Sequence, residues 1–272
     1  MALAAVVQMC SSACVSDNLE NVKQYLCRAE SMGAQLVVLP ENFALMSDDS
    51  QVQVAASEAL GAGPLQDFLR EQAALHGLWI VGGTVPIRAS KDRCYAASLV
   101  IDSQGEVAAQ YNKIHLFDVS LSCGEAHQES DFIEAGSHVC TVDTPIGRLG
   151  LAVCYDLRFP ELFRCMVDNG AQIFSLPSAF TVPTGQAHWH TLARARAIEN
   201  FSYLLAAGQV GRHEGGRQTY GHSLIVDPWG GVITECEKGE GVVCAKIDLN
   251  YLDSVRQSIP AIAQRKLAIS PA

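Results

Sequence analysis

The sequence is poor in aromatic residues, basic residues and long hydrophobic runs. Aromatics occupy only 7% of its 272 positions although 49% are hydrophobic, so small and branched side chains must fill the interior, as in layered α/β proteins. Its 19 lysines and arginines are outnumbered by 29 aspartates and glutamates. The resulting net charge of -10 argues against a nucleic acid or an anionic membrane as partner, and no stretch is long enough to span a bilayer.

The ten cysteines lack the spacing of a metal site or a disulfide framework, since no two of them form a CxxC pair. In a chain of this length we therefore expect reduced thiols and a cytoplasmic protein. Residues 1–9 are apolar but carry no basic region, which predicts a first strand and not a targeting segment.

The hydrophobic pattern predicts an α/β fold in a single domain over residues 1–272, because no linker or change in composition divides the chain. Residues 119–137 have little periodicity and are predicted to form a long loop, and residues 180–185 a shorter one. Strands are expected at residues 4–9, 35–39, 78–83, 95–102, 106–111, 139–142, 148–153, 172–176, 203–207, 222–227, 232–236 and 242–247, and helices at residues 17–33, 64–76, 160–170, 188–201 and 249–258.

Two segments share a pattern at the same spacing, Ile101-Asp102-x-x-Gly105-x-Val107 and Val226-Asp227-x-x-Gly230-x-Val232. Each of them predicts a hairpin turn. The repeat indicates two halves of related topology and two sheets that face each other, with helices on the outside.

Cys154 lies at a strand end, between the apolar run 148–153 and a helix that Pro160 begins. This is the geometry of a nucleophile elbow, although the glycines of the usual serine version are missing. A thiol in this position is close to helix-end amides, which favour the thiolate. The pattern leaves open that Cys154 is one more small buried residue.

Two other apolar strands also end in reactive residues, Glu41 and Lys113. If the three strands lie side by side, their carboxyl ends bring these side chains into one pocket with Cys154. Cys154 then attacks a carbonyl carbon while Glu41 takes the thiol proton. Lys113 and the backbone N–H of Tyr155 stabilise the oxyanion. Taken singly, Glu41 fits a solvated loop carboxylate and Lys113 an exposed lysine, but three such coincidences favour a site.

Three segments resemble the signature motifs of the nitrilase superfamily of carbon–nitrogen hydrolases: Leu39-Pro-Glu-Asn42, Tyr111-Asn-Lys-Ile-His-Leu116 and Cys154-Tyr-Asp-Leu-Arg-Phe-Pro-Glu161. The resemblance covers essentially the whole chain. It implies a four-layer α-β-β-α sandwich and a cofactor-free thiol amidase whose catalytic triad is Glu41, Lys113 and Cys154. It also implies a homodimer or larger homo-oligomer, with helices around residues 160–170 and 188–200 at the dimer face.

The resemblance further implies a second glutamate in the loop after Lys113, which keeps the lysine charged and places the substrate amide. Glu129 matches this position, and Glu125 is the competing candidate. The sequence of the surrounding loop is otherwise unlike the family pattern, so both assignments stay open at this point.

Within the superfamily, the chain is most similar to the branch that hydrolyses amides of α-keto dicarboxylic acids. Arg158 resembles the arginine that holds the keto-acid carboxylate, with Phe180 and Thr184 shaping the same pocket. The structural alternative is a pairing of Arg158 with Glu161.

Residues 208–213 and 247–252 look more like deaminated glutathione amidase than ω-amidase. The resemblance therefore implies metabolite repair, in which deaminated glutathione is cleaved to 2-oxoglutarate and cysteinylglycine. The alternatives are an ω-amidase, an N-carbamoyl amino-acid hydrolase and a metabolite-binding protein without turnover.

Several histidines raise the question of a metal site, among them His188, His190, His213 and His222. His188 and His190 are two residues apart on a predicted helix and so do not share a face. No paired carboxylate motif lies beside them. We therefore expect no metal, and we expect His188 to pack or hydrogen-bond near the pocket.

Overall fold

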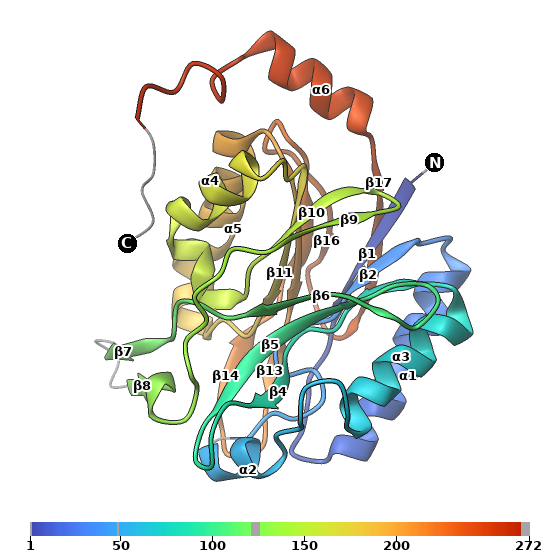
Figure 1. Cartoon of the computed structure of the whole chain (residues 1–272), viewed down its shortest axis with the longest axis vertical. Helices are drawn as coiled ribbons and strands as arrows, with labels where there is room; N and C mark the ends of the chain where they lie inside the picture. The colour runs from blue at the N-terminus through green and yellow to red at the C-terminus, as the bar shows by residue number, and fades with distance from the viewer. Residues whose placement is uncertain (1, 48, 121–125, 268–272) are drawn as a thin grey trace.

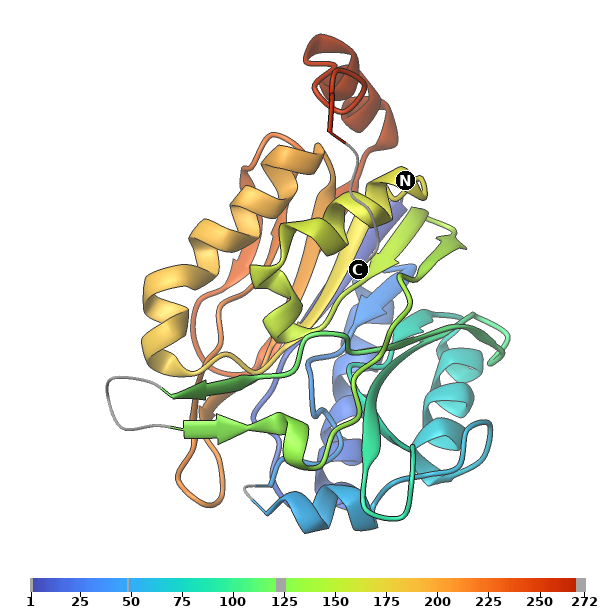
Figure 2. The same ribbon diagram turned by 60° about the vertical axis from the view of Figure 1, so that its left-hand side comes forward.

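The structure is a computed structural model that describes residues 2–47, 49–120 and 126–267. Two large β-sheets lie face to face in its centre, and helices cover the outer face of each sheet (Figure 1, Figure 2). The central strands are buried on both faces, so each sheet packs on one side against the other sheet and on the other side against helices. The expected α-β-β-α order of four layers is confirmed.

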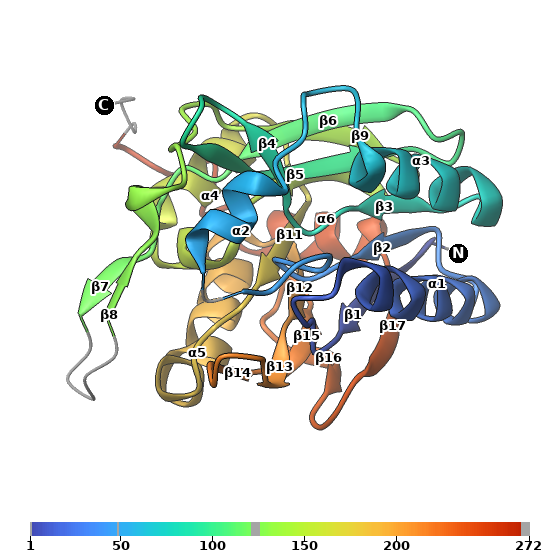
Figure 3. The same ribbon diagram turned by 90° about the horizontal axis from the view of Figure 1, so that it is seen from below.

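The first sheet contains seven strands, which are β1 (Ala2–Gln8), β2 (Leu36–Val38), β3 (Trp79–Val81), β4 (Val85–Arg88), β5 (Cys94–Ile101), β6 (Val107–Asn112) and β17 (Gly241–Ile247). Their order is β17-β1-β2-β3-β5-β4, and β6 pairs with β5. β1, β2 and β3 run parallel, while β17 and β5 flank them in antiparallel register. The outer face packs against α1 (Val15–Ser31) and α3 (Pro64–His76), which Figure 3 shows on the right.

The second sheet contains six strands, which are β9 (Thr141–Thr144), β10 (Gly147–Leu151), β11 (Ile173–Ser178), β12 (Tyr203–Gly208), β15 (Ser223–Val226) and β16 (Val232–Cys236). Their order is β16-β15-β12-β11-β10-β9, with β10, β11 and β12 parallel. Its outer face is covered by α4 (Pro160–Asp168) and α5 (Val182–Asn200). The largest apolar core lies between the two sheets and continues under these two helices.

The remaining elements lie at the edges of the sandwich. They are α2 (Ser50–Ala55), the pair β7 (Asp118–Ser120) and β8 (Ala126–Gln128), the pair β13 (Val210–Arg212) and β14 (Gln218–Tyr220), α6 (Leu249–Ser258), and the 3₁₀ turns η1 (Glu129–Asp131) and η2 (Cys154–Arg158). Among the residues that the structure describes, no helix is both long enough and apolar enough to cross a membrane.

The predicted repeat corresponds to two hairpins with the same turn. In β5–β6 the Asp102 carboxylate accepts hydrogen bonds from the backbone N–H of Gln104 and Glu106, both at 2.9 Å. In β15–β16 Asp227 accepts in the same way from Trp229 and Gly231, at 2.8 and 2.9 Å. Each hairpin also has an irregularity in register at the strand end before the turn. The two facing sheets therefore contain related hairpins, as the sequence predicts.

Two loop predictions are wrong. Within residues 119–137, short strands and the turn η1 replace part of the predicted loop, because each strand has only three residues and gives no measurable periodicity. Helix α5 begins at Val182, inside the predicted loop 180–185, since Pro183 fits the first helical turn. By contrast, the helices predicted at residues 64–76 and 249–258 are confirmed at both ends.

Candidate active site

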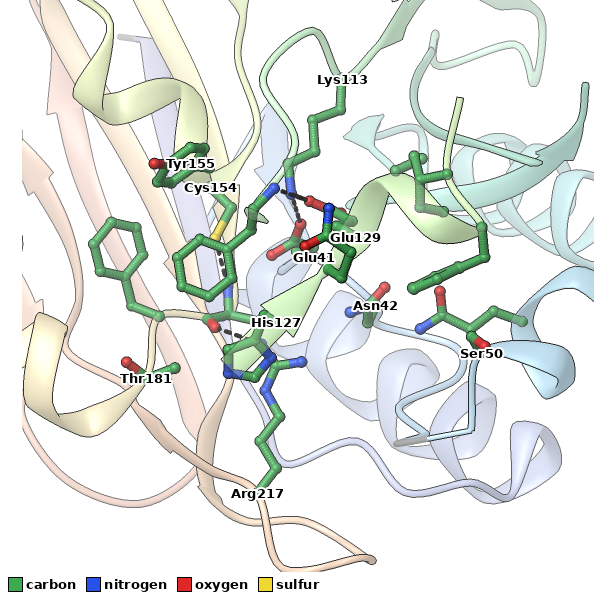
Figure 4. Close-up of a pocket in the computed structure, with 18 of the residues that line it drawn as sticks. Glu41, Asn42, Ser50, Lys113, His127, Glu129, Cys154, Tyr155, Thr181 and Arg217 are labelled. Atoms are coloured by element: carbon green, nitrogen blue, oxygen red, sulfur yellow. Dashed lines mark hydrogen bonds and ion pairs between the residues drawn. The ribbon is translucent and has the colours of Figure 1, made fainter. Parts of the chain in front are cut away.

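Glu41, Lys113 and Cys154 meet in one buried site (Figure 4). The Lys113 ammonium lies 2.9 Å from a Glu41 carboxylate oxygen, and both side chains are almost completely buried. The site forms differently from the expected row of adjacent strands. Glu41 follows β2 and Lys113 follows β6 in the first sheet, where β3 and β5 separate them, whereas Cys154 follows β10 in the facing sheet. The residues meet because the sheets face each other at the carboxyl ends of these strands.

Lys113 is held between two carboxylates. Its Nζ donates to Glu41 Oε1 at 2.9 Å and lies 2.8 Å from each Glu129 oxygen. Burial by itself lowers the pKa of this lysine, but Glu129 and Glu41 together outweigh burial and raise the pKa well above its ordinary value. Lys113 is therefore a fixed positive charge at neutral pH, which suits a group that stabilises an oxyanion.

Cys154 occupies a strained turn next to these charges. Its φ of 47° lies in the left-handed region, and its side chain is buried with the Ala179 backbone N–H 3.4 Å from Sγ. Burial, reinforced by the Glu41 carboxylate, raises the pKa of the Cys154 thiol well above its ordinary value. The thiol is therefore the favoured form of Cys154 at neutral pH, despite its position before a helix. A neutral thiol needs a base, and Glu41 is suited to that role because its carboxylate lines the same cavity and is close enough to raise the pKa of the thiol.

The residue after the nucleophile belongs to the 3₁₀ turn η2, which separates Cys154 from helix α4. Backbone N–H groups in the first turn of a helix have no acceptor within it, so the Tyr155 amide suits the predicted role of oxyanion donor. The Tyr155 ring packs edge-on against Phe117 and Phe159, which fixes the turn.

Glu129 reaches Lys113 from the turn η1 that follows β8. Besides Lys113, its Oε2 accepts a 2.6 Å hydrogen bond from the Phe117 backbone N–H. Burial raises the pKa of Glu129, and the charge of Lys113 opposes this effect. Glu129 therefore has the position expected of the second glutamate. Its competitor Glu125 lies outside the described residues.

Asp156 is a residue that sequence reasoning missed. Its fully buried carboxylate accepts from the Tyr111 hydroxyl and the Val153 backbone N–H, both at 2.8 Å. It also accepts from the His115 backbone N–H at 3.2 Å, and the His115 ring lies 2.7 Å away. One carboxylate therefore joins the segment that carries Lys113 to the turn that carries Cys154. The available signal was an aspartate two residues after the nucleophile in an otherwise apolar stretch.

The three reactive residues line a cavity of about 310 Å³ whose wall also contains Glu129 and the four predicted substrate-binding residues. Arg158 lies over the rings of Tyr155 and Phe180, at 5.8 and 5.5 Å from their centroids. The Thr184 hydroxyl lies 2.8 Å from that of Thr181. The structure thus places every predicted site residue around one cavity.

Arg158 has no carboxylate partner within the described parts of the chain. Its Nη1 lies 3.3 Å from the His188 ring, and the alternative ion pair with Glu161 is not formed. A guanidinium that faces a cavity beside aromatic rings is suited to bind a carboxylate.

The family model for carbon–nitrogen hydrolases matches residues 3–257. The chain belongs to the carbon–nitrogen hydrolases. Proteins named deaminated glutathione amidase from Yersinia enterocolitica and Homo sapiens are 43% and 39% identical to it, over 98% and 97% of this chain and 93% and 82% of their own lengths. The solved structure of Saccharomyces cerevisiae Nit3, a member of branch 10 of the nitrilase superfamily, is 32% identical with a TM-score of 0.87, and the match covers 98% of this chain and 97% of that one.

The geometry of this carbon–nitrogen hydrolase suits attack on an amide. A buried thiol and a buried carboxylate line one cavity, and an ammonium faces the same cavity. Such a set supplies a nucleophile, a general base and an electrostatic stabiliser, as thioester chemistry requires.

A histidine cluster lies on the surface of the hydrolase near α5. The His190 and His222 rings lie 2.9 and 2.5 Å from the same Glu235 oxygen, and the three side chains could together hold a metal ion. His188 instead contacts Arg158 while His190 contacts Glu235, so the prediction that His188 and His190 do not share a face is confirmed. The carboxylate beside these two histidines is Glu235 in β16, which the sequence pattern did not indicate. The absence of a metal stays a prediction.

Proposed function

We propose that this hydrolase cleaves deaminated glutathione to 2-oxoglutarate and cysteinylglycine. The single observation that carries the proposal is the Arg158 guanidinium, which faces the Cys154 cavity and has no carboxylate partner among the described residues. An α-keto acid supplies such a partner. The relatives named deaminated glutathione amidase, at 36–43% identity over nearly the whole chain, support the same substrate.

The proposed reaction begins when the Cys154 sulfur attacks the amide carbon and Glu41 accepts the thiol proton. The negative charge on the carbonyl oxygen is stabilised by Lys113 and by the Tyr155 backbone N–H. Glu41 then gives the proton to the nitrogen as the C–N bond breaks, and cysteinylglycine leaves. Water attacks the thioester with Glu41 again as base, which releases 2-oxoglutarate and restores the thiol. The proposed chemistry uses no cofactor.

The remaining site residues receive supporting roles in this proposal. Glu129 keeps Lys113 protonated by direct contact and places the scissile amide. Arg158 binds the keto-acid carboxylate, while Phe180 and Thr184 shape that end of the cavity. The removal of a side product by such cleavage is metabolite repair.

The test is product analysis by mass spectrometry with the purified protein and Cys154→Ala as control. Deaminated glutathione, α-ketoglutaramate and N-carbamoyl amino acids are compared at equal concentration. We expect the highest kcat/KM with deaminated glutathione and no turnover by the variant. Turnover of only α-ketoglutaramate or a carbamoyl compound identifies an ω-amidase or a carbamoylase instead. Full activity of Cys154→Ala rejects the mechanism, and no turnover with any substrate favours a metabolite-binding role.

The proposal extends to a homodimer or larger homo-oligomer in the cytoplasm. Ile198 on α5 lies against Gly230, the chain neighbour of Trp229, and Ile198 and Trp229 are large hydrophobic side chains with 41% and 58% exposure, which suits a contact through the α4 and α5 layer. All nine cysteines that the structure describes are unpaired, in keeping with a reducing compartment. Light scattering of the wild type and of Ile198→Glu tests the oligomeric state, and cell fractionation tests the cytoplasmic location. A monomeric wild type contradicts the proposed assembly.

A further inference from the structure

A second guanidinium lines the catalytic cavity, and the proposed chemistry so far gives it no role. Arg217 lies in the turn between β13 and β14, where it is half-buried. Figure 4 shows its side chain reaching toward His127 and the nucleophile from the opposite side of the cavity to Lys113. The cavity therefore has a cationic group at a place that neither the triad nor Arg158 occupies.

Arg217 is held at a fixed distance from the nucleophile through a single residue. Its Nη2 donates to the Ala179 carbonyl oxygen at 3.1 Å, and the Ala179 N–H lies 3.4 Å from Cys154 Sγ. One residue spans at most about 3.6 Å, so the guanidinium lies within roughly 10 Å of the sulfur.

The rest of the Arg217 guanidinium lacks partners within the described ranges. Its Nε is buried without a hydrogen bond, the only hydrogen bond of the guanidinium to a described residue is the one from Nη2 to Ala179, and no described carboxylate forms an ion pair with it. This is notable in a chain with net charge -10. A buried donor without an acceptor is unfavourable, and an anionic ligand in the cavity corrects it.

The proposed substrate carries a carboxylate on each side of the scissile amide. The acyl part becomes 2-oxoglutarate, whose keto-acid carboxylate is assigned to Arg158. The leaving group is a dipeptide that ends in the glycine carboxylate. Two residues span at most about 7 Å and a hydrogen bond adds about 3 Å, so that carboxylate can reach a group within roughly 10 Å of the sulfur.

We propose that Arg217 binds the C-terminal carboxylate of the leaving dipeptide. This inference rests on the proposed function. It makes Arg217 a specificity residue, because α-ketoglutaramate releases ammonia and has no carboxylate on that side. A site with both guanidiniums therefore favours an amide of an amino acid or peptide over a primary amide.

The experiment compares three substrates with the wild type and Arg217→Gln. The substrates are deaminated glutathione, the same compound with its glycine carboxylate converted to a primary amide, and α-ketoglutaramate. For the variant we expect kcat/KM with deaminated glutathione to fall about 10- to 100-fold, mostly through KM, with the other two changed less than about twofold. The exposed Arg212→Gln on the same hairpin is the matched control and should leave all three values unchanged.

The wild type alone provides a second test that does not depend on the folding of a variant. Converting the glycine carboxylate to the amide should lower its kcat/KM by the same 10- to 100-fold. Equal rates with the free acid and the amide overturn the subsite, as does an Arg217→Gln variant that loses activity equally on all three substrates. If the wild type does not hydrolyse deaminated glutathione at all, the proposed function fails first and the subsite fails with it.

Discussion

The Tyr111 hydroxyl donates a 2.8 Å hydrogen bond to the Asp156 carboxylate and thereby links the two sheets directly beneath the reactive groups. Tyr111 belongs to β6 of the first sheet, two residues before Lys113, and Asp156 follows Cys154 in the turn after β10 of the second. Both side chains are buried. The distance between the ammonium and the thiol therefore depends on this contact as well as on the packing of the sheets.

Replacing Asp156 by Asn tests this dependence. The amide nitrogen cannot accept the hydrogen bonds that one carboxylate oxygen now receives, so the two segments must shift apart. We expect kcat to fall about 10²-fold with a small change in KM, because small misplacements of reacting groups have effects of that size. We also expect the free energy of unfolding, measured in urea, to fall by about 1–3 kcal/mol.

Tyr111→Phe is the matched control, since it removes one hydrogen bond and leaves the carboxylate. We expect a smaller loss of kcat in this variant. An Asp156→Asn protein that is destabilised but keeps its full kcat contradicts the positioning role.

Glu129→Gln should lower kcat about 10²-fold without preventing alkylation of Cys154 by iodoacetamide. The substitution removes one of the two charges that hold the Lys113 ammonium, so oxyanion stabilisation weakens while the thiol stays in place. Steady-state kinetics and peptide mass spectrometry measure the two effects. Glu134→Gln, in the same segment but paired with Arg93, serves as control. Unchanged kcat in Glu129→Gln rules out a catalytic contribution from this residue.

The sequence was sufficient to predict that Glu41, Lys113 and Cys154 lie close together, because each of them follows an apolar run that is easily recognised as a strand. It was not sufficient to predict how the strands are arranged. Glu41 and Lys113 come from strands separated by two others, and Cys154 comes from the opposite sheet, so the site depends on sheet packing that strand patterns do not encode. The matching turns at Asp102 and Asp227 were the available indication of two facing sheets.

Other features depend on tertiary contacts that have no local signal. Asp156 resembles any polar residue near a helix start until its four contacts, with Tyr111, His115 and Val153, are known. Arg217 lies in a short turn far from the motifs and enters the cavity only because its guanidinium contacts Ala179. The raised pKa of Cys154 likewise follows from burial and from Glu41, which only the tertiary structure brings to the thiol.

Alkylation of Cys154 should depend steeply on pH. Burial and Glu41 raise the pKa of this thiol, so the reactive thiolate is a small fraction that grows about tenfold per pH unit. We expect the rate of labelling by iodoacetamide to rise continuously from pH 6 to pH 9, followed by mass spectrometry of the Cys154 peptide. The exposed Cys27 in the same digest is the internal reference. A labelling rate for Cys154 that is constant over this range indicates a preformed thiolate and contradicts the assignment of Glu41 as base.

Cys94 should make the fold less stable in alkaline solution. Burial, with a smaller effect of Glu129, raises the pKa of this thiol from 9.0 to about 11. Between these two values the folded state binds more protons than the unfolded state, so the free energy of unfolding decreases as pH rises. The contribution is therefore complete below pH 9.0 and is lost as the pH approaches about 11, with a slope of up to about 1.4 kcal/mol per pH unit.

Comparing wild type with Cys94→Ala isolates this effect from the other cysteines and tyrosines that ionise in the same range. Cys94 packs against Ala96 and Ile133, so the variant should lose about 1 kcal/mol at pH 8 from the smaller side chain. The difference between the two proteins should then shrink above pH 9 and change sign before pH 11, because only the wild type must keep a thiol protonated and it loses about 2 kcal/mol over this range. Urea unfolding at pH 8, 9, 10 and 11 measures it. Parallel stability curves over this range mean that the Cys94 thiol does not ionise differently in the folded and unfolded chains.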